Sequence, residues 1–337
     1  MNSSGRIAVV TIGLGLFSPS MNAAQSSSPT FKTGITVVNV PVTVRGDGIL
    51  VTNLHKNDFE IFDNGKRQEI SYFAHQNDVP LNVALLVDVS GSVRQIVEDE
   101  KVTAGQFLER VLRPHDRGII VGFSDSVILW KGFTSSIDLL KTALSNLKPV
   151  ALPAPGLTSD PRKAGTALYD AVTATSTREF PLQTGTKIIV VISDGLDTIS
   201  STTLESAVGS AQTMEVVVYS ICKEDRDNSA TLQYRWIHKS DMSRYDSGCS
   251  ALKALSEPTG GRMFSVSKTM SMQMIFEVIG EEIRSQYLLG FSPSNPGRPG
   301  TRRKLQIRAT RNDIRTTRRD LIVRGRSGYY ASNTNGR

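Results

Sequence analysis

The sequence predicts an α/β fold: a doubly wound, Rossmann-like sheet of mostly parallel strands, flanked by small β-rich units at its N-terminal and C-terminal ends. Short apolar runs typical of strands buried on both faces recur between residues 80 and 285. Segments with helical spacing separate these runs, and strict alternation of strand and helix indicates a parallel sheet. Outside this region apolar residues tend to alternate with polar ones, which indicates strands with one solvated face. With 337 residues, the chain is long enough for about two domains.

Residues 1–24 have the layout of a secretory signal peptide. A single basic residue, Arg6, precedes an apolar run at residues 7–17, and a small polar segment ends at Ala23 and Ala24. The apolar run is shorter than the ~20 residues that span a bilayer. We therefore expect an exported chain, periplasmic or secreted, with no transmembrane segment in its mature part. A disordered N-terminal tail is the alternative.

Residues 30–78 predict a small β-rich domain. Valine occupies every second position from 40 to 44, and Gly46-Asp47-Gly48 then supplies a turn. Asn64-Gly65 lies between two short hydrophobic runs, which is a strong local signal for a hairpin. A few antiparallel strands are expected here.

Residues 80–285 predict the α/β domain itself. Continuous apolar runs predict strands at residues 83–87, 119–123, 188–192 and 216–221. Helical spacing of apolar residues predicts helices around residues 104–111, 139–147, 168–177, 204–214 and 270–283.

A C-terminal strand and a basic β-hairpin are expected at residues 286–331. From Arg298 to the end, twelve Lys and Arg residues stand against two Asp, so this segment carries +10 and the rest of the chain −3 of the total +7. Leu305, Ile307 and Ala309 alternate with polar residues, which indicates a half-buried strand with a solvated cationic face. No aromatic residue is interleaved with these arginines for base stacking, so no nucleic-acid partner is expected.

The first buried strand ends in three oxygen-bearing side chains. Asp88, Ser90 and Ser92 are two residues apart, so an extended loop turns them to one side, and Gly91 permits the tight path. In an open α/β sheet, ligands bind at the carboxyl ends of the strands, where this segment lies. We therefore expect these residues to bind a ligand.

Two further residues are expected at the same edge of the sheet. Asp194 follows the strand at residues 188–192. Thr166 lies at the start of the helix predicted around residues 168–177, where its hydroxyl either caps the helix or faces an ion. Carboxylates and hydroxyls form a hard, all-oxygen set of ligands. Such a set suits Mg²⁺ better than zinc or copper, with Mn²⁺ and Ca²⁺ as alternatives.

Together, Asp88, Ser90, Ser92, Thr166 and Asp194 resemble the metal-ion-dependent adhesion site of von Willebrand factor A domains, and all five positions are intact. The resemblance implies that these residues hold the ion directly or through water, and that an Asp or Glu of a partner protein completes its coordination. It also implies that the loop before Thr166 contributes to specificity. The candidate residues in that loop are Pro149, Pro153, Pro155 and Gly156.

Shorter segments extend the resemblance to an exported branch of these A-domain proteins, known mainly from acidobacteria. The similar segments are at residues 58–65, 259–262, 286–291 and 326–330. The resemblance covers roughly residues 35–331 and implies a fold and a metal site, but it names no ligand.

Export would place Cys222 and Cys249 in an oxidising compartment, where a disulfide is the usual state of two cysteines. The sequence gives no distance between them, so two unpaired buried thiols remain the alternative. A zinc site is not expected, because His238 is the only other soft ligand nearby.

The leading interpretation is an exported, cation-dependent protein-binding module without catalytic activity, and two alternatives stay open. Asp88 also fits the nucleophile of a metal-dependent phosphoryl hydrolase, although Ser90 stands where haloacid-dehalogenase-type enzymes carry a second Asp. The second alternative is a structural cell-envelope protein that binds anionic polymers through Arg302, Arg303 and Lys304.

Overall fold

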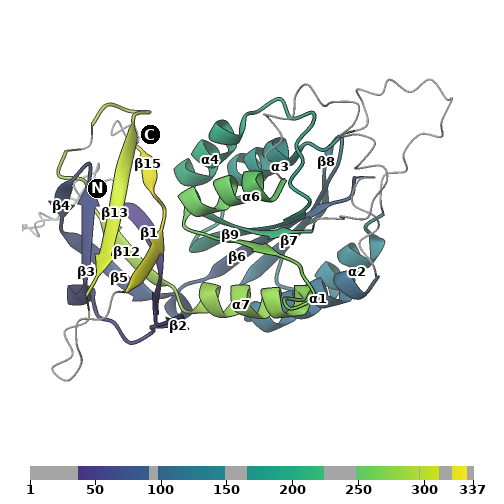
Figure 1. Cartoon of the computed structure of the whole chain (residues 1–337), viewed down its shortest axis with the longest axis horizontal. Coiled ribbons are helices and arrows are strands. Elements are labelled where there is room, and N and C mark those ends of the chain that lie inside the picture. Colours follow the sequence, from purple (N-terminus) through teal and green to yellow (C-terminus); the bar gives the residue numbers. More distant parts are fainter. Residues whose placement is uncertain are drawn as a thin grey trace, which may run out of the picture.

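The computed structural model describes residues 37–90, 98–148, 165–223, 248–295, 297–310 and 321–331 (Figure 1). Two units lie side by side: an α/β domain built on a central sheet, and a sandwich of two smaller sheets. The expected signal peptide lies outside the described residues. Within the described ranges, no helix is both long and apolar enough to cross a membrane.

The α/β domain is built on a six-stranded sheet. Its strands are β6 (Leu81–Asp88), β7 (Arg117–Phe123), β8 (Val127–Thr134), β9 (Thr186–Ser193), β10 (Val216–Cys222) and β11 (Met263–Ser265). In space their order is β11-β10-β9-β6-β7-β8, and all neighbours are parallel except the edge strand β8. The predicted mostly parallel sheet is confirmed, and the four predicted strands are β6, β7, β9 and β10.

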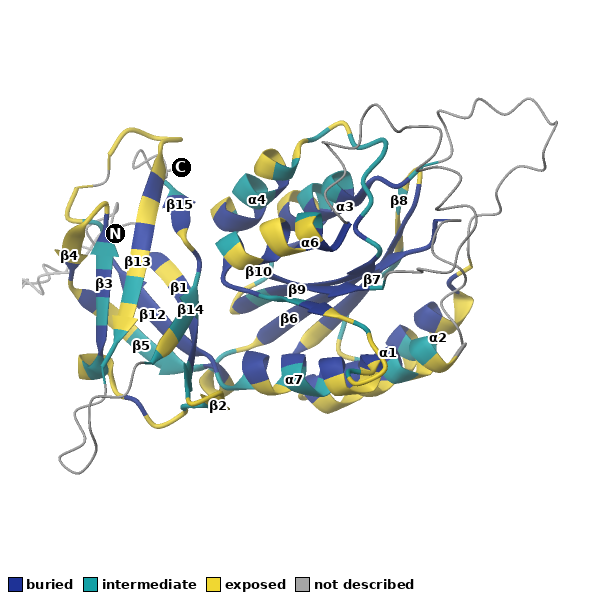
Figure 2. Ribbon diagram, viewed as in Figure 1, coloured by how far each residue is buried: buried dark blue, intermediate teal, exposed yellow. Residues whose placement is uncertain are grey.

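Helices cover both faces of this sheet, as a doubly wound fold requires (Figure 1). One face carries α1 (Glu98–Val111), α2 (Ile137–Asn146) and α7 (Met272–Arg284). The other carries α3 (Leu168–Ala174) with a π-helical turn (Thr175–Glu179), α4 (Leu204–Thr213), and α6 (Gly248–Ser256) with a 3-10 turn (Glu257–Thr259). Every residue of β6 is buried (Figure 2). Helices cover both faces of the strand, so Leu85 packs into one core and Leu86 into the other.

Strands from both ends of the chain share the two sheets of the sandwich. One sheet contains β1 (Val38–Gly46), β2 (Ile49–Leu50), β5 (Ile70–His75), β12 (Tyr287–Phe291) and β14 (Ile322–Gly325). The other contains β3 (Phe59–Asp63), β4 (Lys66–Gln68), β13 (Arg302–Ala309) and β15 (Gly328–Tyr330). Short 3-10 turns lie at Lys56–Asp58 and Gln76–Asp78. Asn64-Gly65 forms the turn between β3 and β4, with φ angles of 48° and 82°.

The sandwich joins the two flanks that the sequence suggests as separate units. β1 pairs with β12, and β3 pairs with β13. Within the basic C-terminal segment, β13 pairs antiparallel with β15, whereas β14 pairs with β1 in the opposite sheet. Local periodicity predicts that a segment is a strand, but it does not reveal a partner far along the chain.

Within β13, the predicted alternation is confirmed, with Leu305 buried and Lys304 and Arg308 exposed. Arg303 is an exception to the solvated cationic face. It is 8% exposed, and its Nη2 lies 2.8 Å from Oδ2 of Asp63, which also accepts a hydrogen bond of 2.9 Å from the Tyr329 hydroxyl. Arg303 is therefore a core residue of the sandwich and is not available to bind a polymer.

Buried polar contacts connect the sandwich to the α/β domain. Glu282 of α7 is 1% exposed and forms ion pairs of 2.9 Å with Arg45 of β1 and with Arg262. Arg326, which follows β14, is 4% exposed and donates to the carbonyl oxygen of Gln212 at 2.9 Å. Glu282 and Arg326 are thus buried charges that each have a partner on the other unit. Such contacts are satisfied only when the two units pack in this arrangement.

Candidate metal centre

Asp88 ends β6 at the point where the strand order of the sheet reverses. The chain builds β7 and β8 on one side of β6, and β9, β10 and β11 on the other. Open α/β sheets bind ligands at such a switch point, beyond the carboxyl ends of the strands. Asp88 is 1% exposed there, and Asp194 immediately follows the adjacent strand β9.

Hydrogen bonds tie the Asp88 carboxylate to the loops on both sides of it. Its Oδ1 accepts from the backbone N–H of Ser90 at 2.9 Å, and its Oδ2 accepts from the Ser193 hydroxyl at 2.6 Å. The Ser193 Oγ in turn accepts from the backbone N–H of Gly195 at 2.9 Å. One network therefore runs from the end of β6 to the loop that carries Asp194.

The charge of Asp88 is poorly compensated. Burial, and secondly the nearby charge of Asp194, raise the pKa of Asp88 from 3.8 to about 7, although hydrogen bonds from Ser193 and Ser90 act in the opposite direction. Asp88 is thus a buried carboxylate that lies close to a second carboxylate, an arrangement that a bound divalent ion would stabilise.

The loop after β9 is held tightly around Asp194. The Asp194 Oδ1 accepts from the backbone N–H of Leu196 at 2.9 Å, and Gly195 has a φ of 80°, which favours glycine. A Cβ atom on Gly195 would lie only 1.9 Å from the carbonyl oxygen of Gly248, the first residue of α6. The loop therefore rests directly on the backbone of α6.

Thr166 is fixed between the loops that follow β7 and β9. The backbone N–H of the next residue, Ala167, donates to the carbonyl oxygen of Ser124 at 2.7 Å. The backbone N–H of Thr166 donates to Oγ1 of Thr198 at 2.9 Å, and its carbonyl oxygen accepts from the Thr198 N–H at 3.0 Å. Thr166 is 3% exposed, and these contacts place it at the same edge of the sheet as Asp88.

The structure brings Asp88, Ser90, Thr166 and Asp194 to one edge of the sheet. Ser90 is 5% exposed. The fifth expected ligand, Ser92, lies outside the described residues, as do the candidate specificity residues Pro149, Pro153, Pro155 and Gly156.

Ser193 belongs to the same network, although nothing in the sequence alone singles it out. A hydroxyl in the last position of a strand is common. Only the parallel register of β6 and β9, in which Val87 lies opposite Ile192, sets Ser193 beside Asp88.

Other carboxylates near this edge are bound by their own loops. Asp170 accepts from the backbone N–H groups of Ser201 and Thr202, both at 2.9 Å. Asp197 accepts from the backbone N–H of Tyr169 at 3.2 Å. These side chains support the loops around the site.

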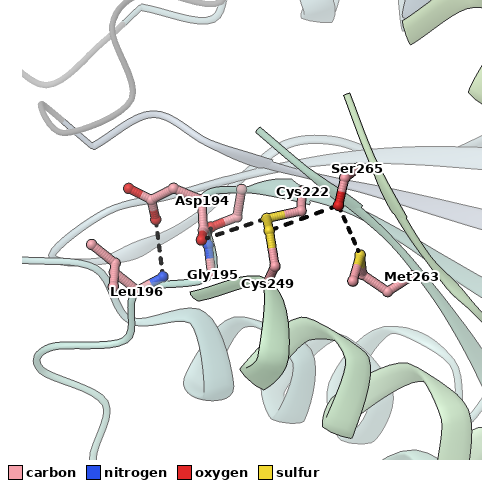
Figure 3. The surroundings of a disulfide bond; sticks show 8 residues. Asp194, Gly195, Leu196, Cys222, Cys249, Met263 and Ser265 are labelled. Carbon is pink, nitrogen blue, oxygen red and sulfur yellow. Dashed lines mark hydrogen bonds between the residues drawn. A yellow bond between two sulfur atoms is a disulfide. The ribbon is translucent and has the colours of Figure 1, made fainter. Parts of the chain in front are cut away.

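A disulfide joins Cys222 to Cys249, whose Cα atoms are 5.5 Å apart. Figure 3 shows the bond beside the loop of Asp194, with the Cys222 sulfur 3.8 Å from the Asp194 carbonyl oxygen. It connects the end of β10 to the first turn of α6. Of the two states that the sequence leaves open for these cysteines, the structure has the bonded one.

The donor atoms at this edge fit a hard cation. Asp88 and Asp194 offer carboxylate oxygens, while Ser90 and Thr166 offer hydroxyls. Within the described ranges, no group of three or more His, Cys, Asp or Glu side chains could hold a metal ion.

Residues 83–196 match the family model described as von Willebrand factor type A domain. This segment contains the end of β6, the start of α3 and the loop of Asp194, and so all of the candidate ligands. No curated protein matches the chain significantly.

Solved structures are similar to part of this chain at low sequence identity. BatB, a conserved hypothetical protein of Bacteroides thetaiotaomicron, is 17% identical over 60% of this chain and 97% of its own, with a TM-score of 0.42. The von Willebrand factor domain of the type V pili tip protein Mfa5 of Porphyromonas gingivalis is 12% identical over 61% and 95%, with a TM-score of 0.43. Proximal thread matrix protein 1 of the mussel byssus, with zinc in its MIDAS motif, is 15% identical over 66% and 49%, with a TM-score of 0.45.

Proposed function

We propose that the von Willebrand factor type A domain of this chain binds one divalent cation through Asp88, Ser90, Ser92, Thr166 and Asp194 and that it binds a protein partner through this site. A bound cation would offer a coordination position to a carboxylate of the partner. The domain type and the position of four of these residues at the switch point of the sheet support the proposal.

The observation that carries the proposal is the buried carboxylate of Asp88 with the charge of Asp194 close to it. A pKa near 7 in place of 3.8 means that burial and the neighbouring charge disfavour ionised Asp88 by about 4 kcal/mol. A purely structural residue at this position would be more stable as an uncharged side chain. A cation-binding role explains why a carboxylate is placed there.

Mg²⁺ is the cation that the site favours, with Mn²⁺ and Ca²⁺ as alternatives. Two carboxylates balance the charge of a divalent ion, and the hydroxyls of Ser90, Ser92 and Thr166 add no further negative charge. The site therefore remains favourable for an anionic ligand from a partner.

The arrangement supports binding rather than catalysis. His55 and His75 lie in the sandwich, and His115 precedes β7, at the opposite end of the sheet from Asp88. None of these described histidines is placed to act as an acid or base at the site.

The disulfide between Cys222 and Cys249 supports an oxidising location, outside the cytoplasm, either periplasmic or extracellular. The partner would contact the carboxyl edge of the sheet. We assign its selection to the loop that contains Pro149, Pro153, Pro155 and Gly156, since loops at this edge carry the function of such folds.

The test is capture of partners from an envelope extract by the immobilised protein in Mg²⁺ or in excess chelator. Asp88→Asn removes one charge with little change in size and should abolish the capture that depends on Mg²⁺. Asp125→Asn is the matched control, because Asp125 is an exposed carboxylate in the loop after β7. Capture that is unchanged in chelator and in Asp88→Asn would contradict the proposal.

Two other outcomes would point to other functions. Turnover of a phosphate ester that is lost in Asp88→Asn would indicate a hydrolase. Capture of an anionic polymer that survives chelation but fails at high salt and in Arg302→Gln/Lys304→Gln would indicate an envelope polymer-binding protein. Arg303 is left unchanged in that variant because it pairs with Asp63 inside the sandwich.

A further inference from the structure

The loop that carries Asp194 and the first turn of α6 touch through their backbones. A Cβ atom on Gly248 would lie 2.0 Å from the carbonyl oxygen of Asp194, and one on Gly195 would lie 1.9 Å from the carbonyl oxygen of Gly248. Two glycines at one contact remove any side chain that would separate the loop from the helix. The position of the Asp194 backbone therefore depends on where α6 begins.

The disulfide fixes the start of α6 at this contact. Cys249 is the residue after Gly248, and it is bonded to Cys222 at the end of β10. Cys222 lies opposite Ser193 in the parallel register of β9 and β10, and the N–H of the next residue, Lys223, donates to the Ser193 carbonyl oxygen at 3.0 Å. Figure 3 shows the sulfur atoms and the Asp194 loop side by side.

We propose that the disulfide between Cys222 and Cys249 is a positioning element of the metal site, which holds the Gly195–Gly248 contact closed and thereby keeps Asp194 in place to bind the cation. This inference rests on the proposed function, because it assigns a role within the same site. The affinity of the site for the cation should therefore depend on whether the disulfide is formed.

Loss of the disulfide should act locally. Leu252 and Leu255 of α6 are fully buried in the core against β10 and would hold the body of the helix in place. The first turn, which contains Gly248 and Cys249, has the disulfide as its covalent anchor to the sheet. Without this anchor, Gly248 can move away from Asp194 while the domain stays folded.

The experiment measures Mg²⁺ and Mn²⁺ affinity of the full chain by calorimetry, for the oxidised protein and for Cys222→Ser/Cys249→Ser. We expect the double variant to bind the cation about tenfold more weakly, since residues that position metal ligands typically change affinity by that order. Its far-ultraviolet circular dichroism should match that of the oxidised protein. Equal affinities in two folded proteins would overturn the inference.

Reduction and reoxidation provide the reversible form of the test. Dithiothreitol gives up two electrons and two protons, which convert the disulfide to two thiols, and it becomes a cyclic disulfide itself. Affinity should fall on reduction and return on reoxidation. Reduction that leaves the affinity of the folded protein unchanged would overturn the inference.

A glycine variant tests the contact itself with the disulfide left intact. Gly248→Ala should weaken cation binding in the same direction as loss of the disulfide, because its methyl group would displace the Asp194 carbonyl. Gly132→Ala is the control, since a Cβ atom there meets nothing within 4 Å. If the oxidised wild-type protein binds neither ion, the proposed function fails; if it binds and these changes have no effect, only the positioning role fails.

Discussion

Asp88 and Ser193, the last residues of two adjacent parallel strands, share a hydrogen bond of 2.6 Å in which the serine hydroxyl donates. Both residues are buried. The same hydroxyl oxygen accepts from Gly195, so a single side chain links Asp88 to the backbone of the loop that carries Asp194. The positions of the two carboxylates are therefore coupled before any ion binds.

Ser193→Ala should lower the free energy of unfolding by about 1–3 kcal/mol, because it leaves the buried N–H of Gly195 without its acceptor and removes the hydroxyl that donates to Oδ2 of Asp88. Urea denaturation in chelator measures this. Ser126→Ala, at an exposed position in the loop after β7, should change the free energy by no more than about 0.5 kcal/mol. Equal effects of the two substitutions would contradict the role assigned to Ser193.

The metal-free domain should lose stability as the pH rises from about 4 to 7. The folded state raises the pKa of Asp88 to about 7, so the folded state keeps a proton that the unfolded state releases near pH 3.8. Asp88 makes its full contribution to the free energy of unfolding below pH 3.8. This contribution is lost as the pH rises to the folded-state pKa of about 7, and the loss is about 4 kcal/mol in total.

Asp88→Asn isolates this effect from that of other titrating groups. In chelator, the difference in unfolding free energy between the variant and the wild type should grow in favour of the variant between pH 5 and pH 8. A difference that does not vary with pH would show that Asp88 does not titrate in this range.

Mg²⁺ should restore the stability that ionisation removes. At pH 8 and a concentration one hundred times Kd, a ligand bound by the folded state alone adds about 2.7 kcal/mol to the free energy of unfolding. The gain should shrink below pH 7, because protons compete with the ion for Asp88. Thermal unfolding with and without Mg²⁺, at pH 8 and at a pH below 7, measures the gain in stability. An equal gain in Asp88→Asn would show that the ion does not bind through Asp88.

The stability of the sandwich should depend on Arg303 and not on its neighbour Arg302. Arg303→Gln leaves the buried carboxylate of Asp63 without its cation and should cost about 3–5 kcal/mol. Arg302→Gln, at an exposed position, should have a small effect. Urea denaturation measures the free energy of unfolding of the two variants. Equal values would contradict the buried ion pair.

Much of the α/β domain could be predicted from sequence because its strands are buried on both faces. The run from Val83 to Val87 has no polar residue and is therefore recognisable without its neighbours. β8 was not predicted, since its residues are mostly half-exposed and show neither a buried run nor a clear alternation.

The position of the candidate ligands at one edge of the sheet could be predicted, whereas their supporting contacts could not. Asp88 and Asp194 follow strands that parallel pairing aligns, so their proximity follows from the strand order. The roles of Ser193 and Gly248 depend on the register of β9 and on the start of α6, neither of which has a local signature. Arg303 looked like a solvated cation because its buried partner, Asp63, is distant in sequence.

The most direct test of the metal centre is the number of Mg²⁺ ions bound per chain, measured by isothermal titration calorimetry at pH 8 on the oxidised protein and on Asp88→Asn. The proposed site predicts one ion for the wild type and no saturable binding for the variant, with Asp125→Asn behaving as the wild type. Equal binding by the wild type and Asp88→Asn, or no binding by either, would contradict it.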